Sequence, residues 1–272
     1  MAKTTAATKQ IIMSDMFDSN DRVGVRRLKV SNEPQELSIA KGHIEGHRMI
    51  YLNSYANVIN STPKLVWPFS SQYVFGDTAT SFWLSSTSAA DTQNILIQTL
   101  DGDYNEQNFV IPLSGQAPVE FSIGTGLRVN KVRNVSPLQT AGDVYIAREN
   151  NHTNGEPDDS DMIVSAFEQS RQTSNLALFT VPAGHTLFGD VGYFSAPKGR
   201  DNDFFWNVRN QSAAIPDTIT NVVSVYESTV QLNFAMTPIP EKTDAFFTSK
   251  TENGSGRVSA RIVGILVDND YL

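Results

Sequence analysis

Few residues in this chain have the types and spacing that catalysis or metal binding requires. There are four histidines and no cysteine, so thiolate nucleophiles, disulfides and cysteine-ligated metal centres are excluded. His43 and His47 lie four residues apart, the spacing at which two imidazoles share one face of a helix in zinc proteases. The sequence HIEGH is not H-E-x-x-H, however, and Gly46 disfavours a helix. We interpret this segment as a polar linker and expect no metal site.

The acidic turn that begins at Asp101 resembles half of a calcium-binding loop. Asp101, Asp103 and Asn105 supply side-chain oxygens at alternate positions. An EF-hand loop also needs glycine at position 6 and glutamate at position 12, where this chain has Glu106 and Pro112. We therefore predict a β-turn here.

Other catalytic signatures are missing from the sequence. It contains no P-loop, no G-x-G-x-x-G after a strand and no G-x-S-x-G elbow, and its histidines lie in separate contexts. We therefore predict a non-enzymatic protein without a cofactor. A glycan-cleaving depolymerase would need two carboxylates in one cleft, and it stays open as a minor alternative.

Composition and charge restrict the class of protein further. The chain has 272 residues, a net charge of −8 and 40% apolar residues, which is enough for a substantial core. Its longest strongly apolar run, 262–267, is too short to span a bilayer, and residues 1–17 lack the apolar stretch of a secretory signal. The negative charge argues against wrapping nucleic acid. We expect neither nucleic-acid nor membrane partners.

The elements that must position any site are predicted from the apolar pattern. Apolar and polar residues alternate over 94–99, 203–209, 230–234 and 257–262, as in strands with one buried face. Turn signals recur every ~10–15 residues. The sequence therefore predicts an all-β fold, an antiparallel, jelly-roll-like β-sandwich, in which 221–234 forms either one bent strand or two.

The chain divides into an N-terminal arm and a body. We predict an extended arm over 1–45 that becomes ordered on a neighbouring surface, although 23–30 could instead be a strand of the main sheet. The arm carries four basic candidate interface residues: Arg22, Arg26, Arg27 and Lys29. The body, 46–272, is either one large sandwich or two smaller ones that meet near 149–161.

Two segments of the body depart from the strand pattern. The stretch 149–161 is rich in acids and asparagines, and we predict a solvated loop there, with a contact loop as the alternative. Residues 165–171 form a weak candidate for a short helix.

Aromatic residues cluster in two places, 67–75 and 204–206. Large rings of this kind are typical of a core or a subunit interface, and we name Trp67, Phe69 and Phe205 as candidate interface residues. The alternative is an exposed platform that binds host glycan.

Four stretches carry motifs that recur together in one family. They are SFWLSSTSAADTQNILIQTLDGDYNEQNFVIPLSG (81–115), LRVNKVRNVSPLQTAGDVYIA (127–147), NLALFTVPAGHTLF (175–188) and TPIPEKTDAFFTSKTENGSGRVSARIVGILVD (237–268). In order and spacing they resemble a family of β-sandwich virion structural proteins of tailed bacteriophages, especially marine and cyanobacterial ones. The segment before Tyr51 and the acidic stretch 149–161 depart from the family's pattern.

The resemblance implies a virion component that decorates the capsid or builds part of the neck or tail. Such a protein would assemble in the bacterial host cytoplasm, form a homo-oligomer and dock onto other virion proteins. It implies no active-site residues. The competing hypothesis is a carbohydrate-binding module of the virion that recognises the host surface.

Overall fold

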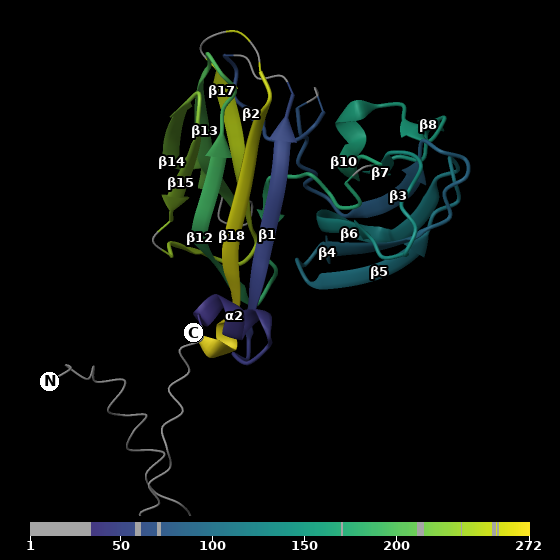
Figure 1. The fold of residues 1–272 in the computed structure, drawn as a ribbon. Coiled ribbons are helices and arrows are strands. Elements are labelled where there is room, and N and C mark those ends of the chain that lie inside the picture. Colours follow the sequence, from purple (N-terminus) through teal and green to yellow (C-terminus); the bar gives the residue numbers. More distant parts are fainter. Residues whose placement is uncertain are drawn as a thin grey trace, which may run out of the picture.

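The computed structural model describes residues 34–57, 61–69, 72–169, 171–210, 215–234, 236–251, 254 and 256–272. In Figure 1 these residues form two β-rich units that lie side by side. We call them the sandwich unit, built from 47–66 and 177–268, and the inserted unit, 67–176.

The sandwich unit consists of two antiparallel sheets packed face to face. The first sheet, in spatial order, contains β1 (His47–Ala56), β18 (Val258–Asp268), β12 (His185–Ser195) and β15 (Thr229–Asn233), and β16 (Pro238–Ile239) also pairs with β12. The second contains β11 (Leu178–Thr180), β17 (Thr243–Thr251), β13 (Asp201–Asn210) and β14 (Ile215–Tyr226), with β2 (Lys64–Leu65) beside β17. This strand order is that of a jelly roll, so the predicted all-β, jelly-roll-like sandwich is confirmed.

The alternation seen in the sequence produces the core of the sandwich. Phe204 and Trp206 point inward from β13, and Val258, Ala260 and Ile262 point inward from β18. These side chains meet between the two sheets, where burial of apolar surface stabilises the fold by roughly 25 cal/mol per Å².

The inserted unit interrupts one edge strand of the second sheet. Both β2 and β11 pair with β17, at neighbouring positions of its register. Between them, Val66 N donates to Phe247 O at 2.9 Å, and Phe247 N donates to Ala177 O at 3.0 Å. The chain therefore leaves the sandwich after Val66, builds a separate unit and returns at Ala177.

A curled antiparallel sheet forms the inserted unit. In spatial order it contains β10 (Ile163–Phe167), β7 (Val144–Ala147), β3 (Thr80–Ser86), β6 (Val119–Asn134), β4 (Asn94–Asp101) and β5 (Glu106–Pro112). Its concave face encloses a second core that includes Phe82, Ile97, Phe121 and Val132. The predicted turn after Asp101 joins β4 to β5, and the Asp101 carboxylate accepts hydrogen bonds from two backbone N–H groups of that turn.

The two units are joined by a third core and a buried ion pair. Leu65, Trp67, Tyr145 and Phe246 belong to this core. Beside it, Arg128 of β6 donates to both carboxylate oxygens of Asp244 of β17, at 3.0 and 2.9 Å. Burial by itself lowers the pKa of Arg128, but the hydrogen bonds and charge of Asp244 outweigh this effect and raise it.

The acidic stretch 149–161 is more ordered than we expected. It contains a small hairpin of β8 (His152–Thr153) and β9 (Glu156–Pro157), followed by the 3-10 turn η1 (Ser160–Met162). His152 Nδ1 lies 2.7 Å from Ser85 Oγ, which anchors the hairpin to β3. We expected any two sub-sandwiches to meet near this stretch, but it lies inside the inserted unit. The predicted domain boundaries stay a prediction.

Three other expectations are corrected or decided. The described residues of 165–171 do not form a helix, because 165–167 belong to β10 and are buried within the inserted sheet. Residues 221–234 form two strands, β14 and β15, in different sheets. Within the predicted arm, 1–33 lie outside the described residues, and α2 (Gln35–Ala40) is a helix whose Ile39 packs against β18.

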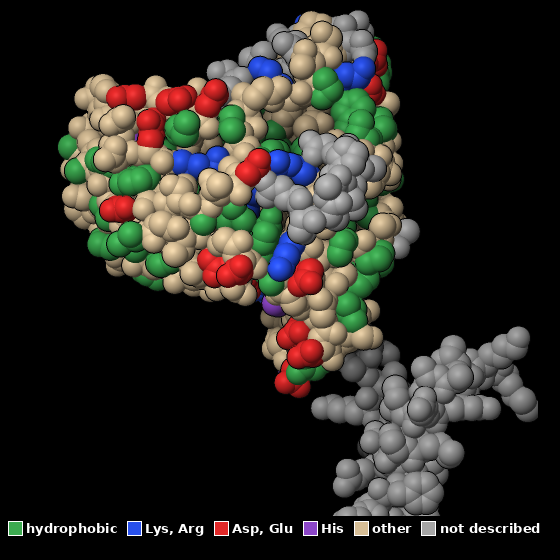
Figure 2. Space-filling view, turned by 180° about the vertical axis from the view of Figure 1, so that it is seen from behind, with side chains coloured by type: hydrophobic (Ala, Val, Ile, Leu, Met, Phe, Trp, Pro, Cys, Tyr) green, Lys and Arg blue, Asp and Glu red, His purple; other side chains and the backbone are tan. Residues whose placement is uncertain are grey.

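Acidic side chains gather at two places on the surface. Figure 2 shows them along the edge of the inserted unit near β8 and at the end of the sandwich unit that carries α2 and the C-terminus. The second group includes Glu36 of α2, Glu45 of the turn before β1, Asp268 of β18 and Asp270 of the C-terminal turn η2 (Asn269–Tyr271).

Candidate association surface

The predicted interface residues lie in different environments. Trp67 is 2% exposed and packs inside the core between the two units, with its ring 5.0 Å from that of Phe69. Phe69 is half-buried against the same core. These two rings therefore stabilise contacts within the chain. Arg22, Arg26, Arg27 and Lys29 lie outside the described residues.

Phe205 lies on a different surface, the outer face of the second sheet of the sandwich. Its neighbours on β13, Phe204 and Trp206, point inward, so the pleat directs Phe205 outward. The side chain is half-buried, and Val222 of β14 lies directly opposite it in the register.

The strand beside Phe205, β14, presents a row of exposed apolar residues. Ile219, Val222 and Tyr226 are 55%, 50% and 58% exposed. Each pairs with an outward-facing position of β13, so all three project from the outer face together with Phe205. Glu227 accepts a hydrogen bond from the Tyr226 hydroxyl and raises the pKa of that hydroxyl.

The position of β14 makes this row accessible. Among the described residues, β14 is hydrogen-bonded only to β13, so its other edge is open. Open edges with exposed apolar residues are sites at which a second chain can add. We call Phe205, Ile219, Val222 and Tyr226, together with the free edge of β14, the association surface.

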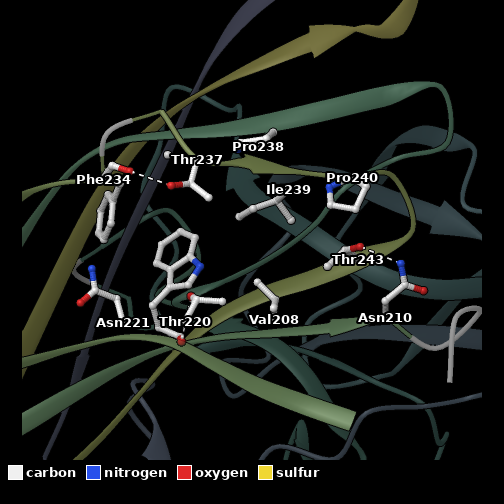
Figure 3. A pocket seen from close by; sticks show the side chains of 12 residues that line it. Val208, Asn210, Thr220, Asn221, Phe234, Thr237, Pro238, Ile239, Pro240 and Thr243 are labelled. Atoms are coloured by element: carbon white, nitrogen blue, oxygen red, sulfur yellow. Dashed lines mark hydrogen bonds between the residues drawn. The ribbon is translucent and has the colours of Figure 1, made fainter. Parts of the chain in front are cut away.

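An apolar pocket of about 230 Å³ opens between the two sheets next to the association surface. Its walls come from opposite sheets, and Figure 3 shows Val208 and Ile239 facing one another across it. The rings of Trp206 and Phe234, 4.8 Å apart, line its inner end.

Polar groups at the rim of this pocket are already hydrogen-bonded. Thr237 Oγ1 donates to Phe234 O at 3.0 Å, and Asn210 Nδ2 donates to Thr243 Oγ1 at 3.1 Å (Figure 3). Thr220 Oγ1 donates to Trp206 O. The pocket therefore suits an apolar side chain, which would displace water without breaking these bonds.

The exposed residues of β14 were not predicted from the sequence as interface residues. The sequence pattern that could have indicated them is the run NVVSVY, 221–226. In a strand, this run places apolar or aromatic residues on both faces. One face of such a strand enters the core, as Val223 and Val225 do, and the other remains for a partner.

The described part of the chain holds neither a cluster of metal ligands nor a helix that could span a membrane. No group of three or more His, Asp or Glu side chains converges there as metal ligands would. None of the helices described is both long and apolar enough to cross a bilayer.

Comparison with known proteins gives no family assignment. No family model matches the chain, and no curated protein matches it. Among solved structures, it is similar to the VP2 subviral particle of infectious bursal disease virus, at 10% identity and a TM-score of 0.19, over 83% of this chain and 73% of that one. It is also similar to a Bacillus thuringiensis Cry1Da tryptic core variant, at 12% identity and a TM-score of 0.17, over 77% of this chain and 52% of that one. These scores are too low to support an argument about function.

Proposed function

We propose that this chain is a non-enzymatic structural component of a tailed-phage virion that acts by self-association and by docking onto other virion proteins. The four motif-bearing stretches supply the link to virions. The observation that carries the proposal is the association surface, where four apolar side chains project beside an open strand edge and an apolar pocket.

The geometry favours contact between copies of the chain. A second strand can add to the edge of β14 through backbone hydrogen bonds, and apolar side chains can fill the adjacent pocket. In a symmetric assembly the same surface would recur on every copy, so many weak contacts would act together. The basic residues of the predicted arm would strengthen docking by meeting acidic surface on a neighbouring subunit.

Assembly from a reducing host cytoplasm is consistent with the composition. A chain without cysteine needs no oxidising compartment to reach its folded state. Apolar burial within each unit and between the two units stabilises the body instead.

The test is the oligomeric state of the full chain, together with its presence in particles. Light scattering after size exclusion should give an oligomer for the natural protein and a smaller species for Val222→Glu, which puts a charge on the association surface. Ile123→Glu is the matched control, because Ile123 is an exposed aliphatic residue of the inserted unit. A monomer at all concentrations, or absence of the chain from purified particles by mass spectrometry, would refute the proposal.

A further inference from the structure

A second open groove lies on the other face of the sandwich unit, far from the association surface in the strand order. It has a volume of about 640 Å³ and crosses the outer face of the first sheet, from β1 over β18 to β12. Its sides come from Tyr55, Tyr193, Arg171, Arg257 and Arg261. We call it the arginine groove.

The groove concentrates positive charge on a negatively charged protein. The chain has a net charge of −8, yet three guanidinium groups line this one surface. Arg257 lies over the Tyr55 ring at 4.0 Å and Arg171 at 5.1 Å from its centroid. The ring thus holds both cations in place, since cations are attracted to the faces of aromatic rings.

Two of these arginines have no acidic partner among the described residues. Arg171 approaches Glu168 at 3.8 Å, whereas neither Arg257 nor Arg261 forms an ion pair with any residue described. Arg261 sits between Asn53 and Tyr193 in the register of the sheet and is exposed. Their donors are free to bind an anion.

A buried donor without a partner lies at the groove. Asn175 lines the groove and is only 5% exposed, and its Nδ2 has no hydrogen-bond partner. Its backbone is fixed, because Asn175 O accepts a hydrogen bond from Ser54 Oγ at 2.9 Å. An unsatisfied buried donor is costly, so an acceptor oxygen at this point would be favoured.

The rest of the lining selects for a molecule rich in hydroxyl groups. The small polar side chains that line the groove are Asn53, Thr173, Ser195, Thr229 and Ser259. Tyr193 is 37% exposed, so part of its ring is free to stack on a sugar ring. Apart from Ala260 and the rings of Tyr55 and Tyr193, the described side chains that line the groove are polar or charged. Strand addition to β18 or β12 is blocked, because each of them has strands on both sides.

We propose that the arginine groove binds an acidic saccharide, with carboxylate groups on Arg257 and Arg261 and hydroxyl groups on the Ser, Thr and Asn side chains. Guanidinium groups bind carboxylates through paired, charge-assisted hydrogen bonds. This binding activity is separate from self-association and does not depend on the proposed virion role.

The test is calorimetric titration of the full chain with a trimer of galacturonic acid. A trimer of galactose has the same ring without the carboxylates and serves as the neutral control. We expect saturable binding of the acidic trimer only, weakened about tenfold or more by Arg257→Gln and by Arg261→Gln. Both arginines are exposed, so neither change should unfold the protein. Lys41→Gln removes the same charge at the distant α2 end and should leave binding unchanged.

Four results would overturn the proposal. The first is that the acidic trimer does not bind, and the second is that the neutral trimer binds equally well. The third is that both arginine variants bind the acidic trimer as tightly as the natural protein does. The fourth is equal or tighter binding of an oligoglutamate peptide or of acetate, which would assign the groove to acidic peptides or to simple anions.

Discussion

Arg128 and Asp244 form a two-point ion pair that links the inserted unit to the sandwich unit, and both side chains are almost completely buried. Thr180 Oγ1 donates a further hydrogen bond to Asp244 at 2.6 Å. The carboxylate is thus surrounded by donors. The pair thus ties β6 of the inserted unit to β17 of the sandwich unit.

Removing one member of this pair should strongly destabilise the protein. Arg128→Ala leaves the Asp244 carboxylate buried without its cation, which typically costs about 3–5 kcal/mol. Urea denaturation measures the loss. Arg48→Gln is the control, because the Arg48–Glu106 pair is partly exposed and should contribute less than about 1 kcal/mol. Equal effects of the two changes would contradict the importance we assign to the buried pair.

Trp67 and Phe205 should respond differently to truncation. Trp67→Ala opens a cavity in the core between the units and should lower the free energy of unfolding by about 3–5 kcal/mol. Phe205→Ala removes a half-buried ring and should cost about 1 kcal/mol. In the size-exclusion assay we expect Phe205→Ala to weaken self-association more than Trp67→Ala does. A stable Trp67→Ala variant would show that this ring is not a core residue.

Gly155 should tolerate no side chain. It adopts φ +80°, and an added Cβ would lie 1.8 Å from Ser86 O. Gly124 has a similar φ of +66° with nothing within 4 Å of an added Cβ, so Gly124→Ala should cost only the backbone term of about 1–2 kcal/mol. The overlap should add roughly 1–3 kcal/mol in Gly155→Ala. Thermal unfolding of Gly155→Ala and Gly124→Ala measures the difference between their stability losses. Equal losses would show that the β8–β9 hairpin does not pack on β3.

Stability should decline at alkaline pH partly through Tyr55. Burial, and then its hydrogen bond to Glu168, raise the pKa of Tyr55 from 10.0 to about 12. Because the folded protein holds this proton more tightly than the unfolded chain does, its contribution is intact below pH 10.0 and is lost as pH rises toward about 12. Tyr55→Phe should show a shallower decline across this interval in denaturation midpoints. An unchanged slope would place the alkaline effect elsewhere, for example at the buried Tyr73.

Local features of the fold could be predicted from the sequence because they depend on neighbouring residues. The alternation over 94–99 correctly places Ile95, Ile97 and Thr99 in the core, since a strand of period two has only two faces. The turn after Asp101 was predictable because it too depends on residues that are close in the sequence. The helix expected at 165–171 was wrong because burial in the inserted sheet, a long-range effect, outweighs a weak local preference.

The division into two units depends on contacts far apart in the sequence. Two strands of the sandwich unit, Lys64–Leu65 and Leu178–Thr180, are too short to be recognised from the sequence. Each is a strand only because it pairs with β17. Trp67 and Phe69 have the composition of an interface, but sequence alone does not say whether the partner is another copy or the same chain. The arginine groove likewise unites Arg171 with Arg257 and Arg261 only after folding.

The place where the inserted unit joins the sandwich has a practical consequence. Val66 and Ala177 are hydrogen-bonded to each other, from Ala177 N to Val66 O at 3.3 Å, so the two junctions are adjacent. A short turn could therefore replace residues 67–176 without moving β17, provided that the surface uncovered by the deletion is made polar. The same junction could accept a foreign domain whose termini lie close together, which makes the jelly roll a scaffold for grafting.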